Sequence, residues 1–71
     1  MKTVYDVQQL LKRFGTIIYV GNRIADLELM EAEVKELYQF QIIEAHEYQR
    51  ALLILRKETA RLRDEKGANS L

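Results

Sequence analysis

The residues of this chain that could take part in covalent or metal chemistry are few, and their spacing fits no catalytic or metal site. Nucleophilic catalysis needs a serine, cysteine or threonine beside a base that is held in place. The sequence has one serine, Ser70, one histidine, His46, and no cysteine. Di-iron sites in helical bundles need Glu-x-x-His on two helices, whereas Glu44-Ala45-His46 has another spacing. We therefore predict no catalytic residue, no metal ligand and no cofactor.

Phosphate binding and acid–base chemistry are also unsupported. A phosphate-cradling loop needs Gly-x-x-x-x-Gly-Lys followed by Ser or Thr, and Gly21-Asn22 fails that test. Acidic pairs such as Glu33 and Glu36 are typical of a solvated helix face. A domain of 71 residues buries only about 60% of the surface of its unfolded chain, which leaves little room for a deep cleft. We expect no enzyme and no small-molecule substrate.

Cations and tyrosines remain as candidates for a binding surface. Proteins bind single-stranded nucleic acid with a basic groove and aromatic rings on which bases stack, at about 1 to 3 kcal/mol per base. The candidate residues for such a surface are Tyr5, Lys12, Arg13, Tyr19, Arg23, Arg56, Lys57 and Arg61. In the alternative interpretation, the arginines of the last third pair with Glu58, Glu65 and the acidic helix, and the tyrosines belong to the core.

The net charge of zero conceals three blocks of alternating sign. Residues 1–25 carry four cations and one carboxylate (+3), residues 26–47 one cation and seven carboxylates (−6), and residues 48–71 six cations and three carboxylates (+3). The acidic block can pair with the basic blocks inside the molecule, or the blocks can present separate surfaces to partners. Pairing inside the molecule is the default expectation.

The first element that must position these side chains is a helix over 4–14. Its apolar residues recur at three- and four-residue steps, Thr3 suits the N-cap, and Gly15 suits the helix end. The following segment, 15–22, contains the strand-like Thr16–Val20, but the chain offers no second strand to pair with it. We expect an extended connector across the bundle; pairing with a second copy of the chain is the alternative.

Two more helices are predicted, over 23–40 and 45–66, and either Asn22 or Asp26 caps the first of them. A heptad register also allows one uninterrupted helix of the coiled-coil type. A break at residues 41–44 is favoured because it buries Ile42 and Ile43. The predicted fold is a compact all-α three-helix bundle, with one domain over 1–66 and a flexible tail over 67–71.

Several apolar residues fall outside the main helix faces, namely Leu29, Phe40, Leu53 and Ile54. Together with the connector they exceed what three short helices easily cover. The hypothesis is a non-enzymatic helical module that binds single-stranded DNA or RNA. The alternative is a module for protein interaction or self-association as a homo-oligomer, with no role in nucleic-acid binding.

The expected location is the cytoplasm, with no membrane association. The apolar runs are far shorter than the roughly 20 residues that span a bilayer. No apolar run of a signal peptide follows Met1.

The chain resembles the YqgQ-like family of small bacterial proteins, whose function is unassigned. The resemblance covers nearly the whole sequence and is carried by Phe14-Gly15, Ile18–Arg23, Asp26–Met30, Glu36–Tyr38 and Ala51–Arg56. It implies a short three-helix domain in the bacterial cytosol and supplies no catalytic or binding residues. In that family a glycine tends to stand where this chain has Gln41, so the break between the second and third helices departs from the family pattern.

Overall fold

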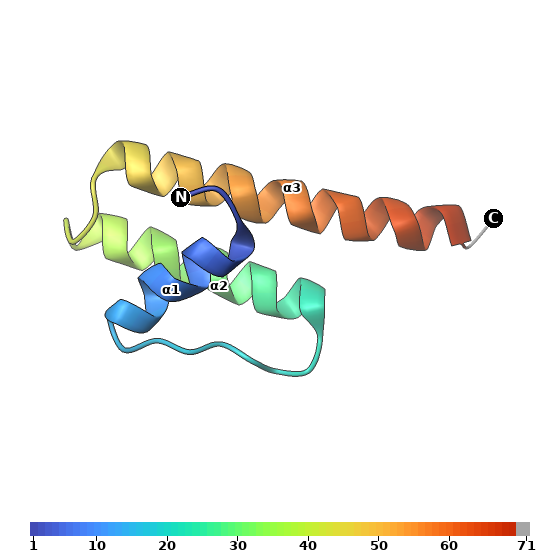
Figure 1. The fold of residues 1–71 in the computed structure, drawn as a ribbon, viewed down its shortest axis with the longest axis horizontal. Helices are drawn as coiled ribbons and strands as arrows, with labels where there is room; N and C mark the ends of the chain where they lie inside the picture. Colours follow the sequence, from blue (N-terminus) through green and yellow to red (C-terminus); the bar gives the residue numbers. More distant parts are fainter. Residues whose placement is uncertain (70–71) are drawn as a thin grey trace.

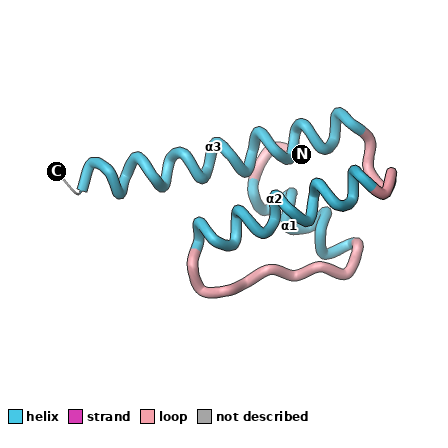
Figure 2. The backbone as a smooth tube through the Cα atoms, turned by 180° about the vertical axis from the view of Figure 1, so that it is seen from behind, coloured by secondary structure: helices cyan, strands magenta, loops and turns pink. Residues whose placement is uncertain are grey.

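Three helices form the structure, a computed structural model that describes residues 1–69. Helix α1 spans Val4–Arg13, α2 spans Arg23–Gln39 and α3 spans Ala45–Asn69. Helices α2 and α3 run antiparallel and side by side, α1 crosses them, and the connector returns along the opposite side of α2 from α3 (Figure 1). No strand occurs in the part of the chain that is described (Figure 2). The predicted all-α three-helix bundle is confirmed.

Helices α1 and α2 begin at the predicted residues, and each ends one residue earlier than predicted. Helix α3 continues past Lys66 to Asn69, so that residues 67–69 of the predicted tail are helical, while Ser70 and Leu71 lie outside the described residues. Its last turns extend beyond the rest of the bundle (Figure 1), which gives the molecule dimensions of 44 × 23 × 18 Å. None of the described helices is long and apolar enough to cross a lipid bilayer.

The N-terminus of α1 is held by a capping box. The hydroxyl of Thr3 accepts a hydrogen bond from the backbone N–H of Asp6, and the Asp6 carboxylate accepts one from the backbone N–H of Thr3. A further bond from the backbone N–H of Lys2, 2.8 Å long, is the first cause that lowers the pKa of Asp6. The predicted cap is confirmed, and it satisfies amide groups that the first turn would otherwise leave free.

The core draws on all three helices. Its buried apolar residues are Val7, Leu10, Leu11, Leu27, Met30, Val34, Ile43, Ala51 and Leu55. The packing between α2 and α3 is the most extensive of the three helix pairs. Near the turn that joins α2 to α3, the rings of Tyr38 and Tyr48 stack with centroids 4.8 Å apart. The bundle therefore rests on an α2–α3 hairpin with α1 laid against it.

The break between α2 and α3 is present, and it uses a left-handed residue. Gln41 has φ 61°, the backbone N–H of Ile42 donates to the Leu37 carbonyl, and that of Gln41 donates to the Tyr38 carbonyl. These two bonds make a Schellman motif, whose left-handed position is usually glycine. Ile43 is buried as predicted, but Ile42 is 49% exposed, so the prediction for Ile42 was wrong. After the Schellman motif, the neighbouring side chains of Ile42 and Ile43 therefore lie on opposite sides of the chain, one exposed and one buried.

The connector is extended and is anchored at both ends. The backbone N–H of Thr16 donates to the Leu11 carbonyl at 2.9 Å, and that of Val20 donates to the buried carboxylate of Asp26 at 2.7 Å. The N-cap of α2 is Asn22, whose side chain accepts from the Ala25 N–H. Asp26 therefore accepts a hydrogen bond from the connector and is not the N-cap of α2.

The middle of the connector is open to solvent. The backbone groups of Ile17, Ile18 and Tyr19 form no hydrogen bond with any described residue. Ile18 packs against the core, whereas Ile17 and Tyr19 are 78% and 84% exposed. This alternation is that of a strand with one covered face, which confirms the expected connector laid across the bundle.

We expect Gln41→Gly to stabilise the protein by about 0.5–1 kcal/mol, because glycine adopts positive φ without steric cost. Urea unfolding followed by circular dichroism measures the change. The matched control is Gln49→Gly, an exposed position within α3, which should destabilise by about 1 kcal/mol. A loss of stability at both positions would contradict the geometry of the turn.

We expect Asp26→Ala to destabilise the protein by about 1–3 kcal/mol, because it leaves a part-buried amide of the connector without an acceptor. Asp26→Asn keeps an oxygen at that place and should cost less. The same urea unfolding distinguishes the two variants, and equal losses for Ala and Asn would show that the bond to Val20 is not what matters.

Candidate ligand-binding surface

Cations of α3 are engaged with the acidic residues of α2. The Arg56 side chain donates to Glu31 at 3.0 Å, and Arg63 donates to Glu28 at 2.9 Å. These ion pairs join the two helices across their long contact. All four side chains remain partly exposed, so that each pair contributes about 0–1 kcal/mol. Their larger effect is on the surface, because the charges of the two blocks are neutralised against each other.

The side chain of Arg61 forms ion pairs with two glutamates of its own helix, α3. It bonds Glu58 one turn before it and Glu65 one turn after it, the latter at 2.7 Å. The hydrogen bond from Arg61 is the main cause that lowers the pKa of Glu58, and the positive charge of Arg23 adds to the lowering. Arg23, at the start of α2, therefore lies within electrostatic reach of Glu58 on α3.

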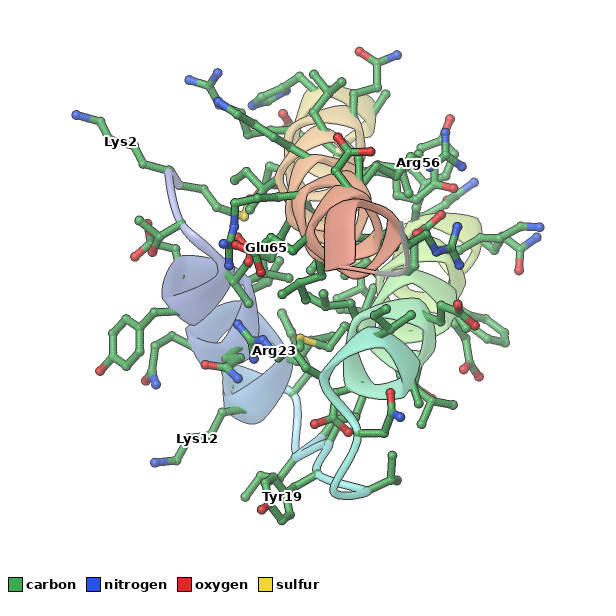
Figure 3. The ribbon with its side chains drawn as sticks, turned by 90° about the vertical axis from the view of Figure 1, so that its right-hand side faces the viewer. Lys2, Lys12, Tyr19, Arg23, Arg56 and Glu65 are labelled. Carbon is green, nitrogen blue, oxygen red and sulfur yellow. The ribbon has the colours of Figure 1, made fainter. Side chains whose placement is uncertain are left out.

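The eight predicted residues do not share one face. Figure 3, a view along α3, shows Arg56 on the side of α2, and Lys12 and Tyr19 on α1 and the connector. Lys57 is exposed on α3 and forms no ion pair among the described residues. The interpretation with internal ion pairs is thus supported for Arg56 and Arg61, while the tyrosines divide into two groups.

Tyr5 and Tyr19 are surface residues, 64% and 84% exposed, so the alternative that placed them in the core was wrong for both. On α1, Tyr5, Gln9 and Lys12 follow one another at steps of four and three, which puts them on one exposed helix face. Figure 3 shows Lys2 and Lys12 on the outer side of α1. Arg13 is exposed at the end of the same helix.

We call this region the α1–connector surface, defined by Lys2, Tyr5, Gln9, Lys12, Arg13, Ile17 and Tyr19. Its three cations form no ion pair with any residue that the structure describes. The nearby carboxylates are committed elsewhere, since Asp6 closes the capping box and Asp26 is buried under the connector. The charge of Lys2, Lys12 and Arg13 is therefore not compensated by ion pairs within the described residues.

A groove of about 220 Å³ lies between α1 and the connector. Its apolar lining comes from Leu11, Ile17, Ile18 and Met30, of which Leu11 and Met30 are buried. The rest of its lining is polar and consists of Gln8, Gln9, Lys12 and Thr16. Sequence reasoning missed this groove, because it exists only where the connector folds back along α1.

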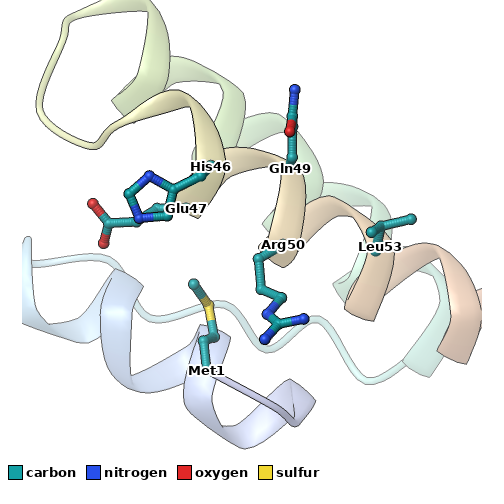
Figure 4. Close-up of a pocket in the computed structure, with 6 residues that line it drawn as sticks. All are labelled: Met1, His46, Glu47, Gln49, Arg50 and Leu53. Carbon is teal, nitrogen blue, oxygen red and sulfur yellow. The ribbon is translucent and has the colours of Figure 1, made fainter.

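A second, wider depression of about 530 Å³ lies between Met1 and the first turns of α3. Figure 4 shows Met1, His46 and Arg50 around the same open space. His46 is exposed, as predicted, with its Nδ1 3.3 Å from a Glu44 carboxylate oxygen. No group of three potential metal ligands occurs in the part of the chain that the structure describes.

The apolar residues predicted to lie off the main faces are in separate elements. Leu29 on α2 is 44% exposed, Phe40 after α2 is 69% exposed and Leu53 on α3 is 68% exposed. Ile54 is partly buried against the core. The most exposed large apolar side chain in the described part of the chain is instead that of Tyr19.

Comparison with known proteins gives a family and no ligand. The family model described as YqgQ-like matches residues 1–61. The chain is 53% identical over 58 residues to a Bacillus subtilis (strain 168) protein described as "Uncharacterized protein YqgQ", and the match covers 82% of each chain.

Proposed function

The chain belongs to the YqgQ-like family, and from the distribution of its surface charges and rings we propose that it is a non-enzymatic module that binds single-stranded nucleic acid through the α1–connector surface. The site comprises Lys12, Arg13, Tyr19 and Tyr5. Four of the eight predicted residues are left out: Arg56 and Arg61 are ion-paired, Lys57 lies on α3, and Arg23 at the start of α2 is near Glu58 of α3. The cytoplasm is the proposed location.

The observation that carries the proposal is the exposure of Tyr19. An aromatic side chain that is 84% exposed has lost little water and offers both ring faces to a base. Stacking on such a ring tolerates any sequence, because every base has a π-face. The backbone on both sides of Tyr19 is anchored, since the side chain of Ile18 packs against the core and the N–H of Val20 donates to Asp26.

The second support is electrostatic. Lys12 and Arg13 lie at the end of α1 that leads into the connector (Figure 1). A single-stranded nucleic acid that runs along the connector would therefore pass these two cations and then Tyr19. Phosphates neutralised by these side chains release counterions, which makes the affinity fall with salt. On the α2–α3 side, by contrast, Arg56, Arg61 and Arg63 are ion-paired with glutamates.

A second candidate, protein interaction or self-association, is favoured by one observation. Ile17 and Val20 are 78% and 57% exposed, and the backbone between them is free to pair with another extended chain. Light scattering over a concentration series tests for self-association, and a monomer at high concentration would remove that form of the candidate.

We expect Tyr19→Ala to weaken binding of a labelled single strand of about 12 nucleotides by about five- to a hundredfold, the loss of one stacked base. Fluorescence anisotropy at two salt concentrations measures it. Lys12→Gln should weaken binding and reduce the slope of log affinity against log salt by about 0.7. The matched control is the double variant Glu31→Gln with Arg56→Gln, which removes an α2–α3 ion pair at constant net charge and should bind as the unaltered protein does.

Absence of binding at micromolar protein, or affinity that salt does not change, would contradict the proposal. So would an equal loss in the double variant and in Tyr19→Ala, because the cations of α3 would then belong to the site.

A further inference from the structure

We propose that the groove between α1 and the connector holds one unstacked base of the bound strand and so gives binding a preference for adenine at one position. This inference rests on the proposed function and goes beyond it, since stacking on Tyr19 and contacts to phosphate carry no base preference.

The size of the groove suits a single ring system. At about 220 Å³ it is smaller than the roughly 300–1,000 Å³ of pockets for drug-sized ligands. Leu11, Ile18 and Met30 supply an apolar surface for the faces of a planar base. Single-stranded nucleic acids are commonly recognised by bases that are turned out of the stack and bound on their faces and edges.

The polar part of the lining suits the edge of a base. Gln8 and Gln9 line the groove, and neither side chain forms a hydrogen bond with a described residue. Each amide offers donors and an acceptor, which is the combination that glutamine uses in bidentate pairing with adenine. No carboxylate lines the groove, and Lys12 is its one charged residue, so that a phosphate at its edge meets attraction and no repulsion.

The groove is close along the chain to the proposed stacking residue, although Tyr19 does not line it. Ile17 lines the groove, and Tyr19 is two residues further along the same extended segment. Side chains at positions i and i+2 of an extended chain lie on one face, about 7 Å apart. That separation lets adjacent nucleotides of one strand place one base in the groove and the next on the ring of Tyr19.

The test compares oligo(A), oligo(C) and oligo(U) of equal length by fluorescence anisotropy. We expect the unaltered protein to bind oligo(A) about tenfold more tightly than the weakest of the three. The double variant Gln8→Ala with Gln9→Ala should reduce this spread to about twofold or less, chiefly by weakening the binding of oligo(A), because neither charge nor Tyr19 is altered. Alanine favours the helix, and circular dichroism checks that α1 is retained.

The matched control is Gln49→Ala, an exposed glutamine of α3, which should keep the full spread. Tight binding with no preference in the unaltered protein, or a preference for oligo(A) that survives in the double variant, would overturn the base pocket and leave the proposed function standing. No binding to any of the three oligonucleotides would overturn both.

Discussion

The antiparallel packing of α2 on α3 is the constraint on which the rest of the structure depends. Leu27, Met30 and Val34 from α2 meet Ala51 and Leu55 from α3 in a core from which water is almost fully excluded. Burial of such side chains contributes about 1.5–3 kcal/mol each for the larger ones, far more than the exposed ion pairs above them. Helix α1 and the connector are laid on this hairpin, through Val7, Leu10 and Ile18, and could not form a core alone.

The same packing decides which charges reach solvent unpaired. Because α2 carries the acidic block and α3 much of the second basic block, the hairpin places Arg56 beside Glu31 and Arg63 beside Glu28. Three of the four cations of the first basic block, Lys2, Lys12 and Arg13, lie on α1 or just before it. Helix α1 and the connector contact the hairpin through apolar side chains such as Val7, Leu10 and Ile18. In this chain of zero net charge, the α1–connector surface combines the exposed rings of Tyr5 and Tyr19 with cations that form no ion pair among the described residues.

Much of the fold could be predicted from the sequence, because its signals are local. The N-cap at Thr3, the cap at Asn22 or Asp26, between which the sequence did not decide, and the three- and four-residue spacing of apolar side chains each act within a few residues. The exposure of Ile42 could not be read in this way, since it follows from the left-handed conformation of Gln41. The binding surface was predicted only in part. Which cations are free depends on the partners that α3 finds on α2, and the groove depends on the return path of the connector; both are contacts between segments distant in sequence.

The division of the surface into a paired α2–α3 side and a free α1–connector side can be tested by nuclear magnetic resonance. In a titration of the isotope-labelled protein with a single-stranded oligonucleotide, the backbone amide signals report which residues meet the ligand. Signals of residues 2–20 should shift progressively, while those of Arg56, Arg61 and Arg63 should stay in place. Shifts concentrated at the three arginines of α3, with α1 and the connector unaffected, would contradict the assignment of the ligand surface.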